Sequence, residues 1–372
     1  MSWDYLQPVK IHFGSGSHEK VGQIAKEMGY KKGFLVSDAF FKASGLAERI
    51  VKESDGVLVG IYAEISPNPE VSEVNRCAEQ LRAAGADFIV ALGGGSALDC
   101  AKAASCMAVC GDPIEKYHGT GVPVPEEHLP IIAVPTTSGT GSEVTCVSVL
   151  SNHAEGKKGP IVSNAFYPVL AVIDPVLTWT MPKTVTASCG IDVLCHAVEG
   201  FWSRNHQPIC DALALHATRL VFQYLERAYN DPKDAEAREK MSEASVIAGL
   251  AFTLPKTTAS HACSFPLTNW YHIPHGEACG LTLDHFCRIN RPVENYRLDA
   301  FCRQLGFADA DAMADEILAL KKRLGLRCDL KDLHLTAEQK DQLAQASLHP
   351  NILNNPVTIT KEMLLEMYEG MS

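Results

Sequence analysis

The amino-acid sequence predicts an α/β domain with a parallel sheet, followed by an all-helical domain. Short apolar runs alternate with helix-like stretches up to residue 174, whereas long segments after residue 182 carry apolar residues at helical spacing. A length of 372 residues also suits two domains better than one. We place the boundary at Met181 and Pro182, because proline opens helices and interrupts what precedes it. The predicted domains are therefore 1–181 and 182–372.

Five continuous apolar runs in the first half are predicted to be strands: 33–37, 57–61, 88–92, 131–134 and 170–173. Such runs are typical of strands buried on both faces of a parallel sheet. Residues 70–84 have helical spacing and end at Gly85, and residues 100–108 are expected to form a further helix. In the second half, residues 209–229 and 235–252 are expected to be helices. The first half thus resembles a Rossmann-like sheet.

Composition excludes several classes of function. The net charge of -11 and pI near 5.7 argue against the basic face that nucleic acid or an anionic membrane requires. Thirteen cysteines without a CxxC pair suit reduced thiols, and hence a cytoplasmic protein, better than a disulfide framework. No apolar run approaches the roughly 20 residues that span a bilayer, so neither export nor membrane insertion is expected.

A glycine-rich turn follows the strand at 88–92 and consists of Gly93, Gly94, Gly95 and Ser96. Glycine lets the backbone approach a ligand whose charge faces a helix N-terminus, so a pyrophosphate would fit here. The alternative is a tight turn in which Ser96 caps the helix and Asp99 completes a capping box. The motif alone leaves both interpretations open.

Asp38 follows the strand at 33–37, where a carboxylate could bind an adenosine ribose and would repel a 2'-phosphate. NAD(H) is therefore favoured over NADP(H). The alternative role of Asp38 is a helix N-cap. It also precedes the glycine turn, whereas the usual dinucleotide fingerprint places the acid about 20 residues after its glycines.

The loop at 135–145 gathers hydroxyl groups after another buried strand, among them those of Thr136, Thr137 and Thr145. Hydroxyls and flexible backbone amides suit phosphate or nicotinamide amide groups. Lys158 could reach the same ligand. A solvated loop and a surface lysine are the alternatives.

Asp192 and His196 lie four residues apart and so share one face of a predicted helix, and His261 and His275 follow fourteen apart. Three imidazoles and one carboxylate suit Fe(II), or Zn(II) as the alternative, and leave a position open for a substrate oxygen. Each histidine alone could be a packing or surface residue, since the chain has fourteen. Their joint occurrence predicts a metal site.

These motifs, in this order, resemble the iron-dependent (group III) alcohol dehydrogenase family over essentially the whole chain. The resemblance implies a nucleotide-binding α/β domain, a helical metal domain, and Asp192, His196, His261 and His275 as metal ligands. It also implies a dinucleotide site lined by Asp38, Asn68, Gly93, Gly94, Gly95, Ser96, Asp99, Thr136, Thr137, Thr145, Lys158 and Leu177. Family likeness further implies a homodimer or higher homo-oligomer.

One position departs from the family pattern. Many members carry a histidine four residues after the third metal ligand, and Phe265 stands there in this chain. Proton delivery is then expected from water, a cofactor ribose hydroxyl or His272, which is our candidate catalytic residue. The surrounding segment is similar to the branch that reduces phosphonoacetaldehyde to 2-hydroxyethylphosphonate. Lys256 and Thr257 could hold an anionic tail there, or form only a solvated helix terminus.

The expected function is metal-dependent, NAD(H)-linked hydride transfer between a small primary alcohol and its aldehyde. A dehydroquinate synthase-like lyase is the alternative enzyme, since it also combines NAD with a metal. A binding module with a structural metal is the non-enzymatic alternative, although such sites usually close their coordination with cysteine.

Overall fold

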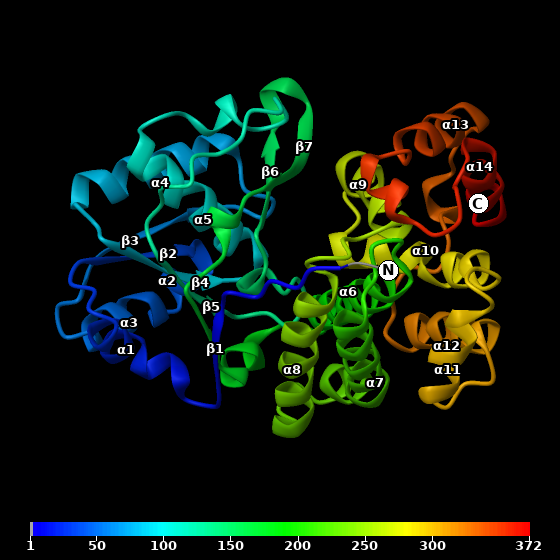
Figure 1. Ribbon diagram of the computed structural model, residues 1–372, viewed down its shortest axis with the longest axis horizontal. Coiled ribbons are helices and arrows are strands. Elements are labelled where there is room, and N and C mark those ends of the chain that lie inside the picture. Colours follow the sequence, from blue (N-terminus) through cyan, green and yellow to red (C-terminus); the bar gives the residue numbers. More distant parts are fainter. Residues whose placement is uncertain (1–2) are drawn as a thin grey trace. The chain divides into compact units, whose positions relative to one another are not determined.

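The computed structural model describes residues 3–372 and divides into two compact units (Figure 1). One unit comprises Gln7–Thr137 and Gly141–Trp179, and the other comprises Thr180–Ser372 with Ser138–Thr140 and the residues up to Leu6. The units divide between Trp179 and Thr180, and the boundary at Met181 and Pro182 stays a prediction. The predicted combination of a parallel α/β sheet and a helical domain is confirmed.

The α/β unit is built on a six-stranded parallel sheet with strand order β1-β8-β5-β4-β2-β3. Its strands are β1 (Lys10–Phe13), β2 (Gly33–Asp38), β3 (Leu58–Ile65), β4 (Phe88–Gly93), β5 (Ile131–Pro135) and β8 (Leu170–Ile173). The central strands β4 and β5 are buried along their whole length, as their continuous apolar runs predicted.

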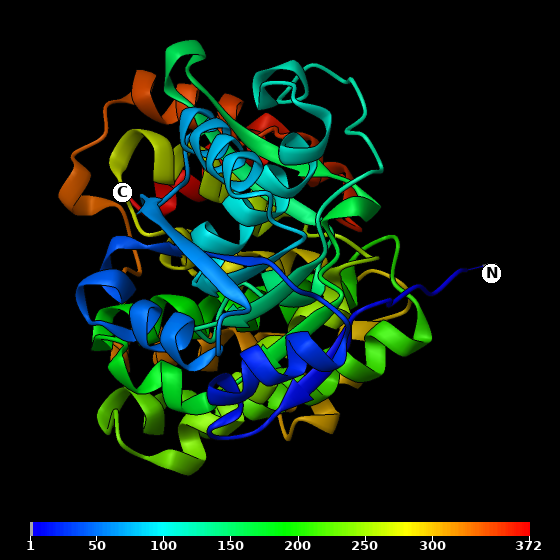
Figure 2. The ribbon, with the colours of Figure 1, turned by 90° about the vertical axis from the view of Figure 1, so that its left-hand side faces the viewer.

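Helices cover both faces of this sheet. They are α1 (Val21–Glu27), α2 (Ala39–Ala43), α3 (Leu46–Glu53), α4 (Val71–Ala84) and α5 (Gly95–Cys110). Ile89 and Ala91 of β4 belong to the core cluster that contains α4 and α5 side chains, whereas Val90 belongs to the cluster that contains α1 and α3 side chains. Alternate residues of one strand thus face opposite layers, and the dark blue α1 and light blue α4 lie on opposite sides of the strands in Figure 2.

The sequence analysis missed a small antiparallel hairpin of β6 (Val147–Asn152) and β7 (Lys157–Val162). Lys158 lies on β7 rather than in a loop. Its strand carries Gly159 and Pro160 and is mostly exposed, so neither apolar alternation nor β-propensity marks it.

The helical unit contains α6 (Lys183–Trp202), α7 (Pro208–Asn230), α8 (Ala235–Phe252), α9 (Ala259–Tyr271), α10 (His275–Asn290), α11 (Arg297–Gln304), α12 (Ala310–Arg323), α13 (Ala337–Ala346) and α14 (Lys361–Gly370). Helix α6 packs against α7, α8 and α10 and is buried from Gly190 onward, so it forms the centre of this core (Figure 1). Polar side chains on α6 are therefore held in the interior. No helix within residues 3–372 combines the length and apolarity that crossing a membrane requires.

Candidate active site

The glycine turn is the N-terminus of α5. This helix begins at Gly95, five residues earlier than predicted, and Gly94 is its N-cap without a side-chain cap. The alternative capping box of Ser96 and Asp99 is therefore wrong. Gly93 has φ of 151°, and a Cβ there would lie 2.6 Å from the Ala97 side chain. Only glycine leaves this helix N-terminus open to a ligand.

Asp38 has the helix-capping role that the sequence left open, and its position leaves the proposed ribose-binding role possible as well. One carboxylate oxygen caps α2 by accepting hydrogen bonds from the backbone N–H groups of Phe40 (3.0 Å) and Phe41 (3.2 Å). The other oxygen faces Gly93, 3.3 Å from where a Cβ would stand. Burial raises the pKa of Asp38 although the two N–H groups oppose this shift. The carboxylate is thus fixed by the helix cap and points toward the glycine turn.

Three further predicted residues lie in a row beside this turn. Lys158 donates a hydrogen bond to the side-chain oxygen of Asn68 (3.0 Å), and the Asn68 backbone N–H donates to Ser96 Oγ (3.2 Å). Asn68 has a positive φ of 59°, a conformation that asparagine adopts more readily than most residues. Thr137 lies against Gly94, because a Cβ on that glycine would stand 3.3 Å from the threonine methyl group. Polar groups from two loops and from β7 therefore lie beside the turn.

A buried lysine that the sequence analysis missed supports the hydroxyl-rich loop. Lys102 of α5 donates hydrogen bonds to Ser142 Oγ (2.7 Å), Thr145 Oγ1 (3.2 Å) and the Val147 carbonyl (2.9 Å). Burial lowers the pKa of Lys102 to about 8. Its spacing of three residues after Asp99 on one helix face was the available signal, since buried lysines need partners.

Asp99 lies in the same network. One of its carboxylate oxygens accepts from Ser142 Oγ (2.7 Å) and the other from the Val149 backbone N–H (2.9 Å). Both oxygens thus hold the loop and β6. Thr136 and Leu177 are also buried. Thr136 directly follows β5, and Leu177 lies in the 3-10 helix Pro175–Thr180.

The predicted metal ligands converge within the helical unit. Asp192 and His196 come from α6, His261 from α9, and His275 begins α10. Ligand atoms of Asp192, His261, His275 and the unpredicted Cys279 all lie within 4.8 Å of one another. His196 Nε2 lies 4.0 Å from Asp192 Oδ1, and the His196 and His261 ring centroids are 4.6 Å apart. Three helices thus bring five potential donors together.

Buried atoms of this cluster fit a bound cation. Asp192 Oδ1, His196 Nδ1 and His261 Nε2 are buried and have no hydrogen-bond partner within residues 3–372. Asp192 Oδ1 and His261 Nε2 face each other at 3.5 Å. Buried polar atoms are nearly always paired, so these three atoms are candidates to bind an ion. A set of nitrogen and oxygen ligands suits Fe(II) or Zn(II).

The charge states of Asp192 and His196 suit a metal site, whereas for His261 burial opposes the shift but Cys279 and Glu199 raise the pKa well above its usual value. Burial opposes the ionisation of Asp192, but His196, His261 and His275 hold the pKa of its carboxyl below its usual range. Burial lowers the pKa of His196 to about 4 against the attraction of Asp192. A carboxylate and a neutral imidazole are the ligand forms that divalent cations bind.

Glu199 orients His261 from behind. Although burial opposes its ionisation, the adjacent His261 lowers the pKa of Glu199. Its carboxylate accepts from His261 Nδ1, from Thr258 Oγ1 (2.8 Å) and from the Ser260 backbone N–H (2.7 Å). The proton of His261 is thereby placed on Nδ1 and the lone pair of Nε2 faces the cluster. Such a carboxylate–histidine pair commonly fixes a metal ligand.

Gly276 allows α10 to approach α6 at the cluster. A Cβ at this position would stand 2.0 Å from the Ser188 carbonyl oxygen and 2.9 Å from Asp192 Cβ. The pair His275 and Gly276 is therefore a close helix contact rather than the simple turn that such a pair often marks.

Phe265, which stands where many family members have a histidine, and the residues near it differ in burial and contacts. Phe265 is one helical turn after His261, and its ring centroid lies 4.3 Å from that of His349. His272 is exposed and ends α9 with φ of 54°. Lys256 precedes α9 with φ of 69°, and Thr257 is buried.

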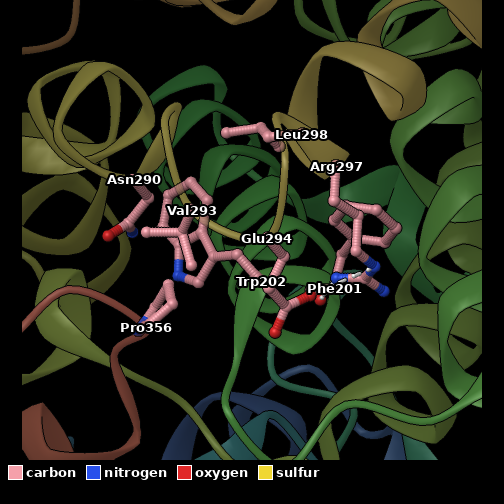
Figure 3. A pocket seen from close by; sticks show the side chains of 8 residues that line it. All are labelled: Phe201, Trp202, Asn290, Val293, Glu294, Arg297, Leu298 and Pro356. Carbon is pink, nitrogen blue, oxygen red and sulfur yellow. Dashed lines mark hydrogen bonds and ion pairs between the residues drawn. The ribbon is translucent and has the colours of Figure 1, made fainter.

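A hollow elsewhere in the helical unit is too small for a substrate (Figure 3). It is lined by Phe201, Trp202, Asn290, Val293, Glu294, Arg297, Leu298 and Pro356 and encloses about 10 Å³. That volume accommodates roughly one water molecule. This hollow is therefore not a candidate substrate site.

Comparisons with known proteins agree with this geometry. The profile described as iron-containing alcohol dehydrogenase matches residues 8–175, and that of the Fe-containing alcohol dehydrogenase family, C-terminal, matches residues 186–371. Alcohol dehydrogenase 4 of Saccharomyces cerevisiae (strain YJM789) is 33% identical over 368 residues, which cover 97% of this chain and 96% of the relative. Both halves of the chain thus match one family.

Two sulfoacetaldehyde reductases are also similar. That of Bilophila wadsworthia (strain 3_1_6) is 38% identical over 280 residues, which cover 75% of this chain and 72% of the relative. The crystal structure of the enzyme from Bifidobacterium kashiwanohense in complex with NAD+ is 57% identical, covers 100% of this chain and 99% of that chain, and has a TM-score of 0.98. This chain belongs to the iron-containing alcohol dehydrogenase family, as its motifs predicted.

Proposed function

We propose that this chain uses NAD(H) and a divalent metal to interconvert a small primary alcohol and its aldehyde, and that sulfoacetaldehyde is its preferred aldehyde. The 57% identity over the whole chain to a sulfoacetaldehyde reductase in complex with NAD+ carries this proposal. Membership of a dehydrogenase family favours it over the lyase and over the binding module.

The metal assignment follows from the cluster. Asp192, His196, His261 and His275 are the proposed ligands, with Fe(II) as the ion and Zn(II) as the alternative. A bound ion of this kind supplies Lewis-acid polarisation of a substrate oxygen. The orphaned buried atoms of Asp192, His196 and His261 support the assignment.

The cofactor assignment follows from the glycine turn. The open N-terminus of α5 suits a pyrophosphate, and Asp38 beside Gly93 suits a ribose diol. We propose that Asn68, Ser96, Thr136, Thr137, Lys158 and Leu177 line the same site. Asp99 and Thr145 act on it through the loop that Lys102 holds.

The substrate assignment refines the expectation of a phosphonate. Sulfoacetaldehyde and phosphonoacetaldehyde share a two-carbon aldehyde with a tetrahedral anionic tail. The similar enzymes act on the sulfonate, so we propose the sulfonate first. After hydride transfer the alkoxide must gain a proton, for which His272, water and a cofactor ribose hydroxyl remain the candidates.

The test is steady-state oxidation of NADH by the Fe(II)-loaded protein with sulfoacetaldehyde, phosphonoacetaldehyde and propanal. We expect turnover of all three, with the highest kcat/KM for sulfoacetaldehyde and loss of turnover in His261→Ala. Absence of turnover with every aldehyde would contradict the dehydrogenase activity. A higher kcat/KM for phosphonoacetaldehyde would contradict only the proposed preference for sulfoacetaldehyde.

We also propose a cytoplasmic enzyme that forms a homodimer or a higher homo-oligomer. The free cysteines, twelve of which are not exposed, support the compartment. Light scattering of the purified protein tests the oligomeric state, and a monomer at micromolar concentration would contradict it.

A further inference from the structure

A histidine from another part of the chain lies where the family pattern is interrupted. Phe265 shares a face of α9 with the metal-ligand candidate His261, one turn earlier. The ring of His349 packs on Phe265 with a centroid distance of 4.3 Å and an interplanar angle of 40°. His349 directly precedes the 3-10 helix η8 (Pro350–Asn354), which packs along α9. The imidazole is therefore held close to the metal-bearing face of α9.

The hydrogen bonds of His349 define which ring nitrogen carries a proton. Its Nδ1 accepts the backbone N–H of Asn351 at 3.2 Å. A nitrogen that accepts an N–H is unprotonated, so the neutral ring carries its proton on Nε2. Burial lowers the pKa of His349, which favours this neutral form. Nε2–H has no acceptor within residues 3–372 and remains available as a donor.

Thr257, in the segment before α9, also keeps a hydrogen-bond donor for a ligand. The hydroxyl oxygen of Thr257 accepts from the Asn351 side chain (2.9 Å), and the Thr257 carbonyl accepts from the Asn354 side chain (3.0 Å). These bonds occupy the acceptors and leave the Thr257 hydroxyl proton free to donate. They also tie η8 to the start of α9, so His349 and Thr257 are held on one rigid frame.

Charge around this frame favours an anion. Neither residues 256–264 nor residues 349–354 contain a carboxylate, although the whole chain carries a net charge of -11. Lys256 directly precedes Thr257, and its ammonium makes no ion pair within residues 3–372. The one carboxylate shown above to contact this segment, Glu199, is paired with His261 Nδ1, so the spare donors of Thr257 and His349 beside Lys256 are complementary to an oxyanion.

We propose that His349 Nε2–H, together with the Thr257 hydroxyl, binds the anionic tail of the substrate and so selects two-carbon aldehydes that end in a sulfonate. The inference rests on the proposed function, because it places the tail while the aldehyde oxygen lies at the metal. His349 is then a specificity-determining residue. It acts without the histidine that many family members carry at the position of Phe265.

Two matched variants test this role in the Fe(II)-loaded full-length protein. His349→Phe keeps a ring against Phe265 and removes the donor, whereas His349→Gln keeps an N–H donor of similar reach. The measured quantity is the ratio of kcat/KM for sulfoacetaldehyde to kcat/KM for propanal. We expect this ratio to fall about 10- to 100-fold in His349→Phe, mainly through KM for sulfoacetaldehyde, and to recover in part in His349→Gln.

Three results would overturn the proposal. An equal loss on both aldehydes would place His349 at the reacting centre or in the scaffold, and an unchanged ratio would remove it from recognition. Failure of His349→Gln to recover any of the ratio, with an unfolding midpoint equal to that of the wild type, would show that the donor is not what matters.

A second measurement separates this proposal from the proposed function. If the wild type does not reduce sulfoacetaldehyde, inhibition of propanal reduction by methanesulfonate still reports on the anion site. Competitive inhibition that weakens about tenfold in His349→Phe supports the site. Inhibition that is absent in the wild type, or equal in both proteins, contradicts it.

Discussion

The proposed metal cluster of the helical unit and the Lys102–Asp99 network of the α/β unit differ in what their buried polar side chains do. In the helical unit, Asp192, His196 and His261 each keep a buried atom that has no hydrogen-bond partner among residues 3–372. In the α/β unit, the polar side-chain atoms of Lys102 and Asp99 form hydrogen bonds with the loop at 135–145 and with β6. The cluster therefore leaves side-chain atoms open for the proposed ion, whereas the Lys102–Asp99 network fixes the loop beside the proposed cofactor site.

This difference teaches how each site should respond to mutation. A proposed ligand atom in the helical unit would contact the ion itself, so its loss should weaken metal binding directly. A support in the α/β unit acts through the position of a loop, so its loss weakens cofactor binding gradually. The comparison predicts large, metal-linked effects on one side and smaller, cofactor-linked effects on the other.

The largest effect is expected from Asp192→Asn. The variant removes the negative charge that faces three imidazoles, and we expect metal affinity to fall by more than about 100-fold, which exceeds the usual effect of a supporting residue. Metal content after dialysis, measured by atomic spectroscopy, checks this. Full metal occupancy in the variant would mean that Asp192 is not a ligand.

Glu199→Gln should have the next largest effect. The amide no longer accepts as a charged group from His261 and Thr258, so His261 loses its fixed orientation. We expect metal affinity to fall about 10- to 100-fold. The control Thr258→Val removes one hydrogen bond to Glu199 and the one that Thr258 accepts from Trp202 Nε1 (2.8 Å) but leaves the Glu199 charge, so it should lower the affinity less. Equal losses would point to general packing instead.

Lys102→Met tests the cofactor side of the comparison. Loss of three hydrogen bonds should loosen the loop at Ser142 and Thr145, and we expect the Kd for NADH to rise about tenfold with unchanged metal content. Lys116→Met, which removes an exposed ion pair with Asp112, is the control and should leave the Kd unchanged. Loss of metal from Lys102→Met would break the separation of the two sites.

The smallest effect concerns the pH dependence of stability. Burial raises the pKa of Glu143 from 4.5 to about 7. A raised folded-state pKa contributes stability that is full below pH 4.5 and is lost as the pH rises through 7, when the buried carboxyl ionises. Glu143→Gln cannot ionise, so its unfolding midpoint relative to the wild type should rise by a few degrees between about pH 4.5 and pH 8. If the difference in unfolding midpoint between Glu143→Gln and the wild type stays constant across this pH range, the pKa of Glu143 is not raised.

The sequence predicted those parts of the fold that depend on local pattern. The runs that became β4 and β5 are continuously apolar, and α8 matches its predicted bounds. The start of α5 was misplaced because glycine disfavours helix interiors, whereas Gly95 occupies the first helical position, to which that interior penalty does not apply. The hairpin β6–β7 was missed because its second strand is exposed and contains Pro160.

The site was predictable where spacing on one helix carries the information, as for Asp192 and His196. Cys279 was missed although it follows His275 by four residues, because buried cysteine is usually a packing residue. The pairing of His349 with Phe265 joins two distant segments through tertiary packing alone. No single-sequence pattern predicts such a contact.

The central claim is that the cluster in the helical unit binds the catalytic metal. Titration of the metal-free protein with Fe(II) under anaerobic conditions, in parallel with NADH-linked reduction of sulfoacetaldehyde, tests it most directly. The account predicts one ion bound per chain, activity that rises in proportion to occupancy, and neither binding nor activity in His261→Ala. Full activity in the metal-free wild type, or stoichiometric binding in His261→Ala, would contradict it.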